Sequence, residues 1–248
     1  MRITVRELYH DTYYFFSKQI KMIIFISISV TFLNIFLEML FQPDMHISSI
    51  IENNHFINAN SLLELINNMN IYEKHQLLKY SIVKIMIFLA SKTILTSSII
   101  TLILFLSNMI KDSIISLIYS FLSFLPSLFM LNFLTVIIIQ LGLMLFVVPG
   151  VLLSIILPLS PIILSFKHGG LISSIRTSMY LSWKHIKIIG PGVLFWIFGK
   201  FFITILFLSY MHVMNKNIIL FMLNISINII FSILIIYLFR FYMIFIRS

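Results

Sequence analysis

SIISLIYSFLSFLPSLFMLNFLTVIIIQLGLMLFVVPGVLLSIILPLSPIILSF, residues 113–166, contains no Asp, Glu, Lys, Arg or His. At a rise of about 1.5 Å per residue, a single helix of this length would reach about 80 Å, more than twice a bilayer hydrocarbon core of about 30 Å. A soluble domain of 248 residues could not bury such a run. The sequence therefore indicates a polytopic membrane protein.

The composition agrees with a membrane location. Hydrophobic residues make up 60% of the chain and charged residues 10%, against about 25% charged in ordinary soluble domains. The mean hydropathy is +1.07 and the formal net charge is +9. The basic residues flank apolar segments instead of forming a stripe, so we interpret them as orientation signals and expect membrane lipids, not nucleic acid, as partners. The chain has no cysteine, which removes disulfides and thiolate metal sites.

The apolar segments predict an all-α fold, with six transmembrane helices in one integral membrane domain over residues 1–248. The predicted spans are residues 22–40, 92–110, 127–147, 151–166, 188–210 and 218–239. A turn at Pro149-Gly150 is expected to separate the third span from the fourth, and Pro158 and Pro161 predict a kink inside the fourth. Residues 41–91 form the predicted outer loop, in which residues 61–69 and 71–84 have helical patterns. The second of these is expected to continue into the second span.

The placement of lysine and arginine predicts the orientation. Eleven of the 17 basic residues fall on the side that holds both termini, five, among them Lys92, fall on the other, and Lys200 lies inside the fifth span. Cytoplasmic loops carry the excess of Lys and Arg, so both termini are expected in the cytoplasm. Residues 1–21 are too long and polar for the n-region of a cleavable signal peptide and read as a cytoplasmic segment before the first span.

An amphipathic stretch precedes each odd-numbered span, over residues 5–20, 113–127 and 172–186. The apolar face of the last consists of Ile172, Ile175, Met179, Trp183 and Ile186. Such patterns are typical of helices that lie in the membrane interface. We hypothesise three units, each an interfacial helix followed by a membrane hairpin. The alternative is that amphipathic connectors are common and that their number is coincidental, since no residue-level repeat supports the threefold plan.

Motifs along the whole chain resemble one known family. They are Phe146-Val147-Val148-Pro149-Gly150-Val151, a proline-containing span, Gly169-Gly170, Ser173-Ser174-Ile175-Arg176 through Trp183-Lys184, the ending Ile235-Ile236-Tyr237-Leu238-Phe239-Arg240-Phe241-Tyr242-Met243, and the opening Tyr9-His10-Asp11-Thr12 with Phe15-Phe16. With these motifs, the chain resembles the YciC-type inner-membrane protein family. The resemblance implies a multi-pass protein of the bacterial inner membrane with no assigned activity, so it carries over no catalytic residue.

No catalytic constellation is recognisable in the sequence. The seven glycines lack the spacing of a phosphate-binding loop, and neither G-x-S-x-G nor H-E-x-x-H occurs. His10 beside Asp11 could form an acid–base pair, but a solvated interfacial helix explains the two residues better. We therefore expect neither enzyme activity nor a cofactor. No carboxylate lies at the middle of a predicted span, which counts against a proton- or sodium-driven transporter.

Six polar residues in the predicted spans form a candidate intramembrane polar cluster: Lys200, Asn34, Glu38, Gln140, Asn224 and Asn228. A lysine at the centre of a span costs about 2.5–3.5 kcal/mol on insertion scales, so Lys200 is expected to face the bundle or a water-filled cavity.

Two functional interpretations of this cluster follow. In one, the chain is a permease or lipid-handling protein in which Lys200 and the amides line a cavity for an anionic group such as a lipid phosphate. In the other, which we prefer, it is a non-enzymatic membrane component in envelope or lipid organisation. Lys200 would then snorkel or pair with Glu38, and the amides would lie in packing seams between helices.

Overall fold

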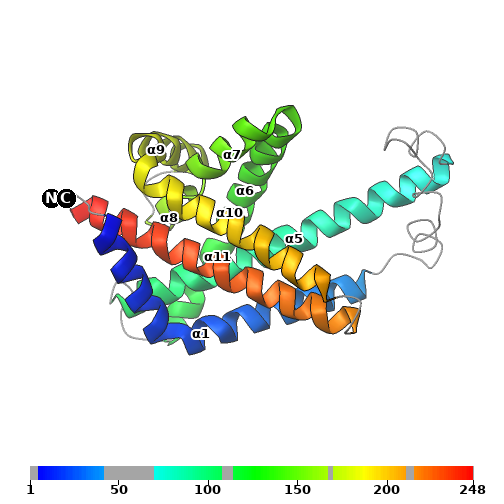
Figure 1. Cartoon of the computed structure of the whole chain (residues 1–248), viewed down its shortest axis with the longest axis horizontal. Helices are drawn as coiled ribbons and strands as arrows, with labels where there is room; N and C mark the ends of the chain where they lie inside the picture. Colours follow the sequence, from blue (N-terminus) through cyan, green and yellow to red (C-terminus); the bar gives the residue numbers. More distant parts are fainter. Residues whose placement is uncertain (1–4, 42–69, 108–113, 167–169, 211–214, 248) are drawn as a thin grey trace. The chain divides into compact units, whose positions relative to one another are not determined.

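Every regular element in the described part of the chain is a helix. The computed structural model describes residues 5–41, 70–107, 114–166, 170–210 and 215–247. The helices are α1 (Val5–Leu40), α5 (Ile71–Leu106), α6 (Ile114–Leu145), α7 (Val147–Ile156), α8 (Ser160–Ser165), α9 (Leu171–Lys184), α10 (Ile186–Ser209) and α11 (Lys216–Arg247) (Figure 1).

Six helical segments of these described ranges are long and apolar enough to cross a membrane. They are Val5–Leu40, Ile71–Leu106, Phe121–Leu145, Val147–Ser165, Ile186–Ser209 and Asn217–Ile246. The prediction of an all-α protein with six membrane spans is therefore confirmed, although several boundaries differ from those predicted.

The largest boundary differences lie at the starts of the first two spans. Helix α1 begins at Val5, so the stretch expected before the first span is continuous with it; Figure 1 shows α1 bending, with its darkest-blue N-terminal part taking its own direction. Helix α5 begins at Ile71, which confirms that the second helical segment of the predicted outer loop continues into the second span. The rest of that loop, including the helical pattern at residues 61–69, lies outside the described residues.

The start of α5 follows from its sequence. The backbone N–H of Asn70 donates to the Glu73 carboxylate at 2.9 Å, and the Asn70 side-chain oxygen accepts from the N–H of Ile71 at 2.8 Å. An Asn at the N-cap with a Glu three residues later lets side chains satisfy backbone groups that the first turn leaves unpaired. The Glu73 charge also suits the positive end of the helix dipole.

Of the three amphipathic stretches, only the one before the fifth span forms a separate helix, α9. The stretches before the first and third spans are continuous with α1 and α6 in the described residues. The described residues contain no separate interfacial helix before the first or the third span, so the structure does not support the three-unit hypothesis there.

The chain turns between α6 and α7 at Phe146, whose backbone is extended (φ −157°, ψ 151°). The prediction of a turn at Pro149-Gly150 was wrong, because both residues lie in the first turn of α7. Proline is tolerated there, since the first N–H groups of a helix have no partner within it. Gly150 has a packing role instead: a Cβ at this position would lie 2.7 Å from the backbone nitrogen of Leu143 in α6.

The predicted kink in the fourth span is confirmed, because this span is divided into α7 and α8. Pro161 has no N–H to donate to the Leu157 carbonyl. The hydroxyl of Ser160 donates to that carbonyl at 2.6 Å and the Ser160 backbone N–H at 3.0 Å. The break therefore leaves the Leu157 carbonyl satisfied, as a proline-containing helix in lipid requires.

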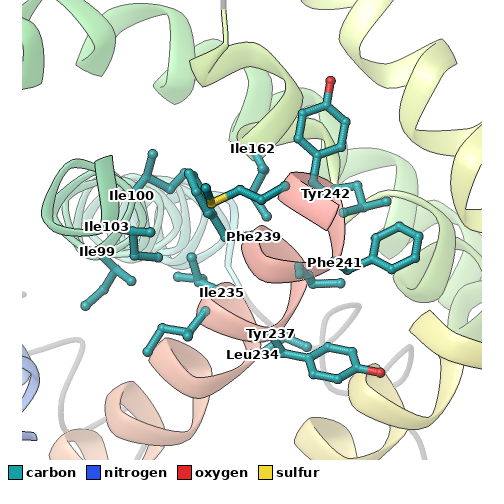
Figure 2. Packing of buried hydrophobic residues seen from close by; sticks show 14 of the residues in the cluster. Ile99, Ile100, Ile103, Ile162, Leu234, Ile235, Tyr237, Phe239, Phe241 and Tyr242 are labelled. Atoms are coloured by element: carbon teal, nitrogen blue, oxygen red, sulfur yellow. The ribbon is translucent and has the colours of Figure 1, made fainter. Parts of the chain in front are cut away.

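By its contacts the chain separates into two compact units, Met1–Thr31 with Lys92–Ser248 and Phe32–Ser91. The single-domain organisation stays a prediction, and each unit is described by itself. In the larger unit the core is centred on α11, where residues 234–243 are buried apart from the half-buried Arg240. Figure 2 shows Ile235 and Phe239 of α11 together with Ile99, Ile100 and Ile103 of α5. Burial on nearly every side of this part of α11 explains why Arg240 is its one charged residue.

Helices α10 and α11 lie side by side (Figure 1). The hydroxyl of Tyr237 donates to the Ile188 carbonyl at 2.7 Å and so joins the two helices. A Cβ at Gly192 would lie 2.5 Å from Cε1 of Tyr237, so the glycine lets the aromatic ring lie directly against α10. Small residues at such positions are how membrane helices approach closely.

We predict that Gly150→Val destabilises the protein, because its Cβ would meet both the side chain and the backbone of Leu143. Overpacking of this kind costs about 1–3 kcal/mol. The measurement is the thermal unfolding midpoint of the purified protein in mild detergent. Gly170→Val is the matched control, since nothing lies within 4 Å of a Cβ at Gly170. Equal midpoints for the two variants would contradict the close α6–α7 packing.

Candidate functional site

Lys200 lies in the second half of α10, which ends at Ser209. Its side chain is exposed on the larger unit, and the expectation that it faces the bundle or a water-filled cavity stays a prediction. The backbone carbonyl of Lys200 accepts from the hydroxyl of Thr204 at 2.8 Å, so this turn of α10 is regular. An exposed lysine within a span can direct its ammonium group along the helix toward the membrane surface.

A second lysine lies near Lys200. Lys92 of α5 is half-buried and is close enough to Lys200 for their like charges to interact. Its Nζ lies 5.5 Å from the centroid of the Phe231 ring on α11, an arrangement that stabilises a cation. The sequence analysis placed Lys92 at the outer edge of a span. That placement stays a prediction; in the structure Lys92 lies inside the continuous helix α5, which begins at Ile71.

Trp196 completes this group. Its ring centroid lies 5.6 Å from that of Phe231. Trp196 precedes Lys200 by about one helical turn on α10, so both side chains lie on one side of that helix. Its indole Nε1 is buried without a hydrogen-bond partner in the described structure. We call Lys92, Lys200, Trp196 and Phe231 the two-lysine cluster.

Asn228 of α11 is used in helix packing. Its side-chain amide donates to the hydroxyl of Thr31 on α1 at 2.9 Å, and its backbone carbonyl accepts from the buried Ser232 at 2.8 Å. Thr31 and Ser27, one turn apart on α1, are both fully buried. Hydrogen-bonded amides and small hydroxyl residues of this kind are typical of seams between membrane helices.

In the smaller unit, Asn34 and Glu38 contact each other. The Asn34 amide donates to the Glu38 carboxylate at 3.2 Å, and the Asn34 oxygen accepts from the hydroxyl of Ser91 on α5 at 2.9 Å. These contacts join α1 and α5 within that unit. Gln140 is exposed on α6 and Asn224 is half-buried on α11, and neither makes a hydrogen bond to a described residue. The described hydrogen bonds therefore do not join the six candidate residues into one cluster.

The sequence analysis missed Asn132, a buried amide on α6 that is only 2% exposed. Its Nδ2 donates to the hydroxyl of Thr93 on α5 at 3.0 Å. Thr93, Ser97 and Thr101 are all buried and lie along one side of α5. The available signal was an amide inside an apolar segment, and the same signal selected Asn34 and Asn228.

Helix α9 packs with its polar side inward. Ser174, Ser178 and Ser182 are fully buried, and the hydroxyl of Ser178 donates to the Ile156 carbonyl of α7 at 2.7 Å. Most of the predicted apolar face is directed outward: Ile172 is 79% exposed and Trp183 is 62% exposed, whereas Ile175 and Ile186 are half-buried against the core. A small-residue face lets α9 pack closely, while the apolar face is left for lipid.

His185 lies at the junction of α9 and α10. Burial, together with the charge of Lys184 beside it, holds the pKa of His185 below its ordinary value. Its ring packs edge-on against Phe241 and Phe245, at 5.5 and 5.7 Å between ring centroids. The imidazole is therefore uncharged at neutral pH and acts as part of the apolar packing.

In the described part of the chain, no group of three or more His, Cys, Asp or Glu residues could hold a metal ion. The side-chain hydrogen bonds that join one described helix to another come from amides and hydroxyls. Together, the fold and these groups define a multi-pass α-helical membrane protein whose intramembrane polar residues mostly join helices.

The chain belongs to the uncharacterised protein family UPF0259, whose profile matches residues 1–244. This is the YciC-type family that the sequence resembles. A UPF0259 membrane protein of Buchnera aphidicola from Acyrthosiphon pisum (strain Tuc7) is 64% identical over 248 residues, which is all of both chains. A UPF0259 membrane protein of Yersinia pestis (strain Pestoides F) is 32% identical over 98% of this chain and 96% of its own. No solved structure matches the chain.

We predict measurable coupling between Asn132 and Thr93. Interhelical hydrogen bonds in membranes contribute about 0.6 kcal/mol on average and up to about 1.7 kcal/mol. A double-mutant cycle with Asn132→Leu and Thr93→Val, read from unfolding free energies in detergent, should give a coupling energy in this range. The matched cycle combines Gln140→Leu with Thr93→Val and should give zero, because Gln140 is exposed and unpaired in the described structure. Strictly additive effects of Asn132 and Thr93 would contradict the seam.

Proposed function

We propose that this protein is a non-enzymatic component of the bacterial inner membrane, with both termini in the cytoplasm, that organises anionic lipids around itself. The observation that carries the proposal is the inverted packing of α9. Three of its serines, Ser174, Ser178 and Ser182, are buried, whereas Ile172 and Trp183, with the basic residues Arg176 and Lys184, are exposed.

The outward side of α9 has the chemistry of a membrane interface. Trp183, an aromatic residue with a polar N–H, suits the level of the lipid headgroups. Arg176 and Lys184 are exposed beside it. Each basic residue at an anionic leaflet contributes about 1 kcal/mol of attraction. The excess of Lys and Arg on this side of the chain supports a cytoplasmic location for α9, because inner loops carry that excess.

The polar groups within the spans support the non-enzymatic part of the proposal. The buried amide of Asn132 and the half-buried amide of Asn228 each donate to a threonine of a neighbouring helix. Such hydrogen bonds hold helices together and leave these amide groups occupied.

The second candidate is a permease or lipid-handling protein acting at Lys200, and one observation favours it. The Lys92 ammonium lies 5.5 Å from the ring centroid of Phe231, and the same ring packs at 5.6 Å against Trp196, which precedes Lys200 by one helical turn. Like charges in that environment are costly, and residues that carry such a cost are commonly functional.

The orientation can be tested directly because the chain has no cysteine. We predict that a cysteine at His75 is labelled by a membrane-impermeant maleimide in intact spheroplasts, whereas a cysteine at Thr177 is labelled only after permeabilisation. Both positions are exposed in the structure, so access depends only on the side of the membrane. The reverse labelling pattern would contradict the proposed topology.

Lipid organisation can be tested with spin-labelled lipids in vesicles of phosphatidylcholine and phosphatidylglycerol. We predict that phosphatidylglycerol is enriched at the protein surface and that Arg176→Gln with Lys184→Gln lowers this selectivity. At about 1 kcal/mol for each charge, the loss is up to about fivefold per substitution. Thr177→Ala, an exposed neutral position on α9, is the control. Unchanged selectivity in the double variant would reject α9 as the lipid-organising element.

A further inference from the structure

We propose that the two-lysine cluster is a binding site for a phosphate anion, with Lys92 and Lys200 as the cationic ligands and the Trp196 indole as a further donor. This inference rests on the second candidate function, the permease or lipid-handling protein. It adds to that function a second lysine, the class of ligand and the depth of the site in the membrane.

Geometry brings the parts together from three helices. Phe231 of α11 has the Lys92 ammonium 5.5 Å from its ring centroid and the Trp196 ring 5.6 Å away, so it contacts residues of both α5 and α10. Lys200 lies one helical turn beyond Trp196 on α10. Its neighbour Gly199 packs on α11, where a Cβ would lie 3.5 Å from Cδ1 of Ile230. Trp196 and Lys200 on α10 therefore lie beside the part of α11 whose Phe231 ring contacts the Lys92 ammonium.

The helices α5 and α10 also place the two lysines at one depth. Counted in residues, Lys92 is as far from the last residue of α5, Leu106, as Lys200 is from the first residue of α10, Ile186. At about 1.5 Å per residue, both lie about 21 Å from helix ends that are expected at the cytoplasmic surface. With a hydrocarbon core of about 30 Å, the cluster lies in the half of the membrane nearer the outer leaflet. Flexible lysine side chains can extend from there toward the outer headgroups.

The charges of the cluster are not balanced by the described protein. In the larger unit the described carboxylates are Glu7 and Asp11, both near the start of α1. Neither lysine ammonium forms an ion pair or a hydrogen bond with a described residue of this unit. Two like charges repel each other, and an anion between them makes both interactions attractive.

A phosphate group fits these donors better than a carboxylate does. Lysine ammonium groups bind phosphate as point charges and supply several N–H donors. The buried Nε1 of Trp196 has no partner in the described structure, and a buried tryptophan N–H usually has one. A tetrahedral anion with three or four oxygens can accept from all three residues. The source of the phosphate is either a phospholipid headgroup or a small phosphate ester from the outer side.

Native mass spectrometry of the full-length protein in mild detergent tests the site, with phosphatidylglycerol and glycerol phosphate as the two probes. We expect Lys92→Met and Lys200→Met each to weaken phosphatidylglycerol binding at least tenfold. Lys200→Arg should retain binding, because arginine keeps the charge. Lys84→Met is the matched control: Lys84 is an exposed lysine of α5 whose Nζ lies 5.8 Å from the centroid of the Tyr80 ring.

The outcomes separate the two sources. Loss of phosphatidylglycerol binding with no measurable binding of glycerol phosphate identifies a lipid headgroup, whereas lysine-dependent binding of both probes identifies a site for small phosphate esters as well. Binding that is unchanged in both Lys→Met variants, or equally weakened by Lys84→Met, overturns the site. A variant that fails to fold is replaced by the corresponding Lys→Gln variant.

A lipid-transfer assay in vesicles separates this inference from the function on which it rests. Lysine-dependent binding without transfer of labelled phosphatidylglycerol between leaflets would retain the site and reject the lipid-handling function. Transfer that persists in both Lys→Met variants would retain the function and reject the site.

Discussion

The need to satisfy every backbone and side-chain polar group without water governs this structure. In lipid, a backbone N–H or carbonyl without a partner costs several kcal/mol, which leaves the α-helix as the favourable element for a chain with this hydropathy. The same constraint acts at the break in the fourth span. There the hydroxyl of Ser160 donates to the Leu157 carbonyl, to which Pro161 cannot donate. The kink is therefore compatible with a membrane location because a side chain completes the hydrogen bonding.

The constraint extends to side chains and explains how helices are joined. Asn132 and Asn228 donate to threonines on other helices, and Tyr237 donates to a backbone carbonyl of α10. Close approach depends on glycine where side chains would collide, at Gly150 between α6 and α7 and at Gly192 beneath Tyr237. Polar contacts and small residues together specify which helices pack, since lipid chains are as apolar as the helix surfaces.

Against this background, α9 and the two-lysine cluster are two of the places where apolar or charged groups are left outside the packed core. Helix α9 exposes Trp183 and Ile172 while burying serines, which is unfavourable in water and favourable at a lipid surface. Lys92 and Lys200 are charges within spans. In the proposed topology, one feature lies at the inner surface of the membrane and the other in its outer half, so the two would serve one protein that holds anionic lipids.

The sequence alone determined the all-α fold, the six spans, the kink at Pro158 and Pro161 and the family, because hydropathy, proline chemistry and local motifs act over short distances along the chain. It also selected Lys200, Asn34 and Asn228, since a polar residue in an apolar run is visible without a structure. Only the tertiary structure decided what those residues contact. The turn lies at Phe146, Lys92 approaches Lys200, and Asn132 bonds to Thr93, and each of these depends on packing between helices. The periodicity of the sequence shows which face of a helix is apolar or polar, but it does not show which helix packs against that face. For this reason the structure changed the candidate site and left the fold class as predicted.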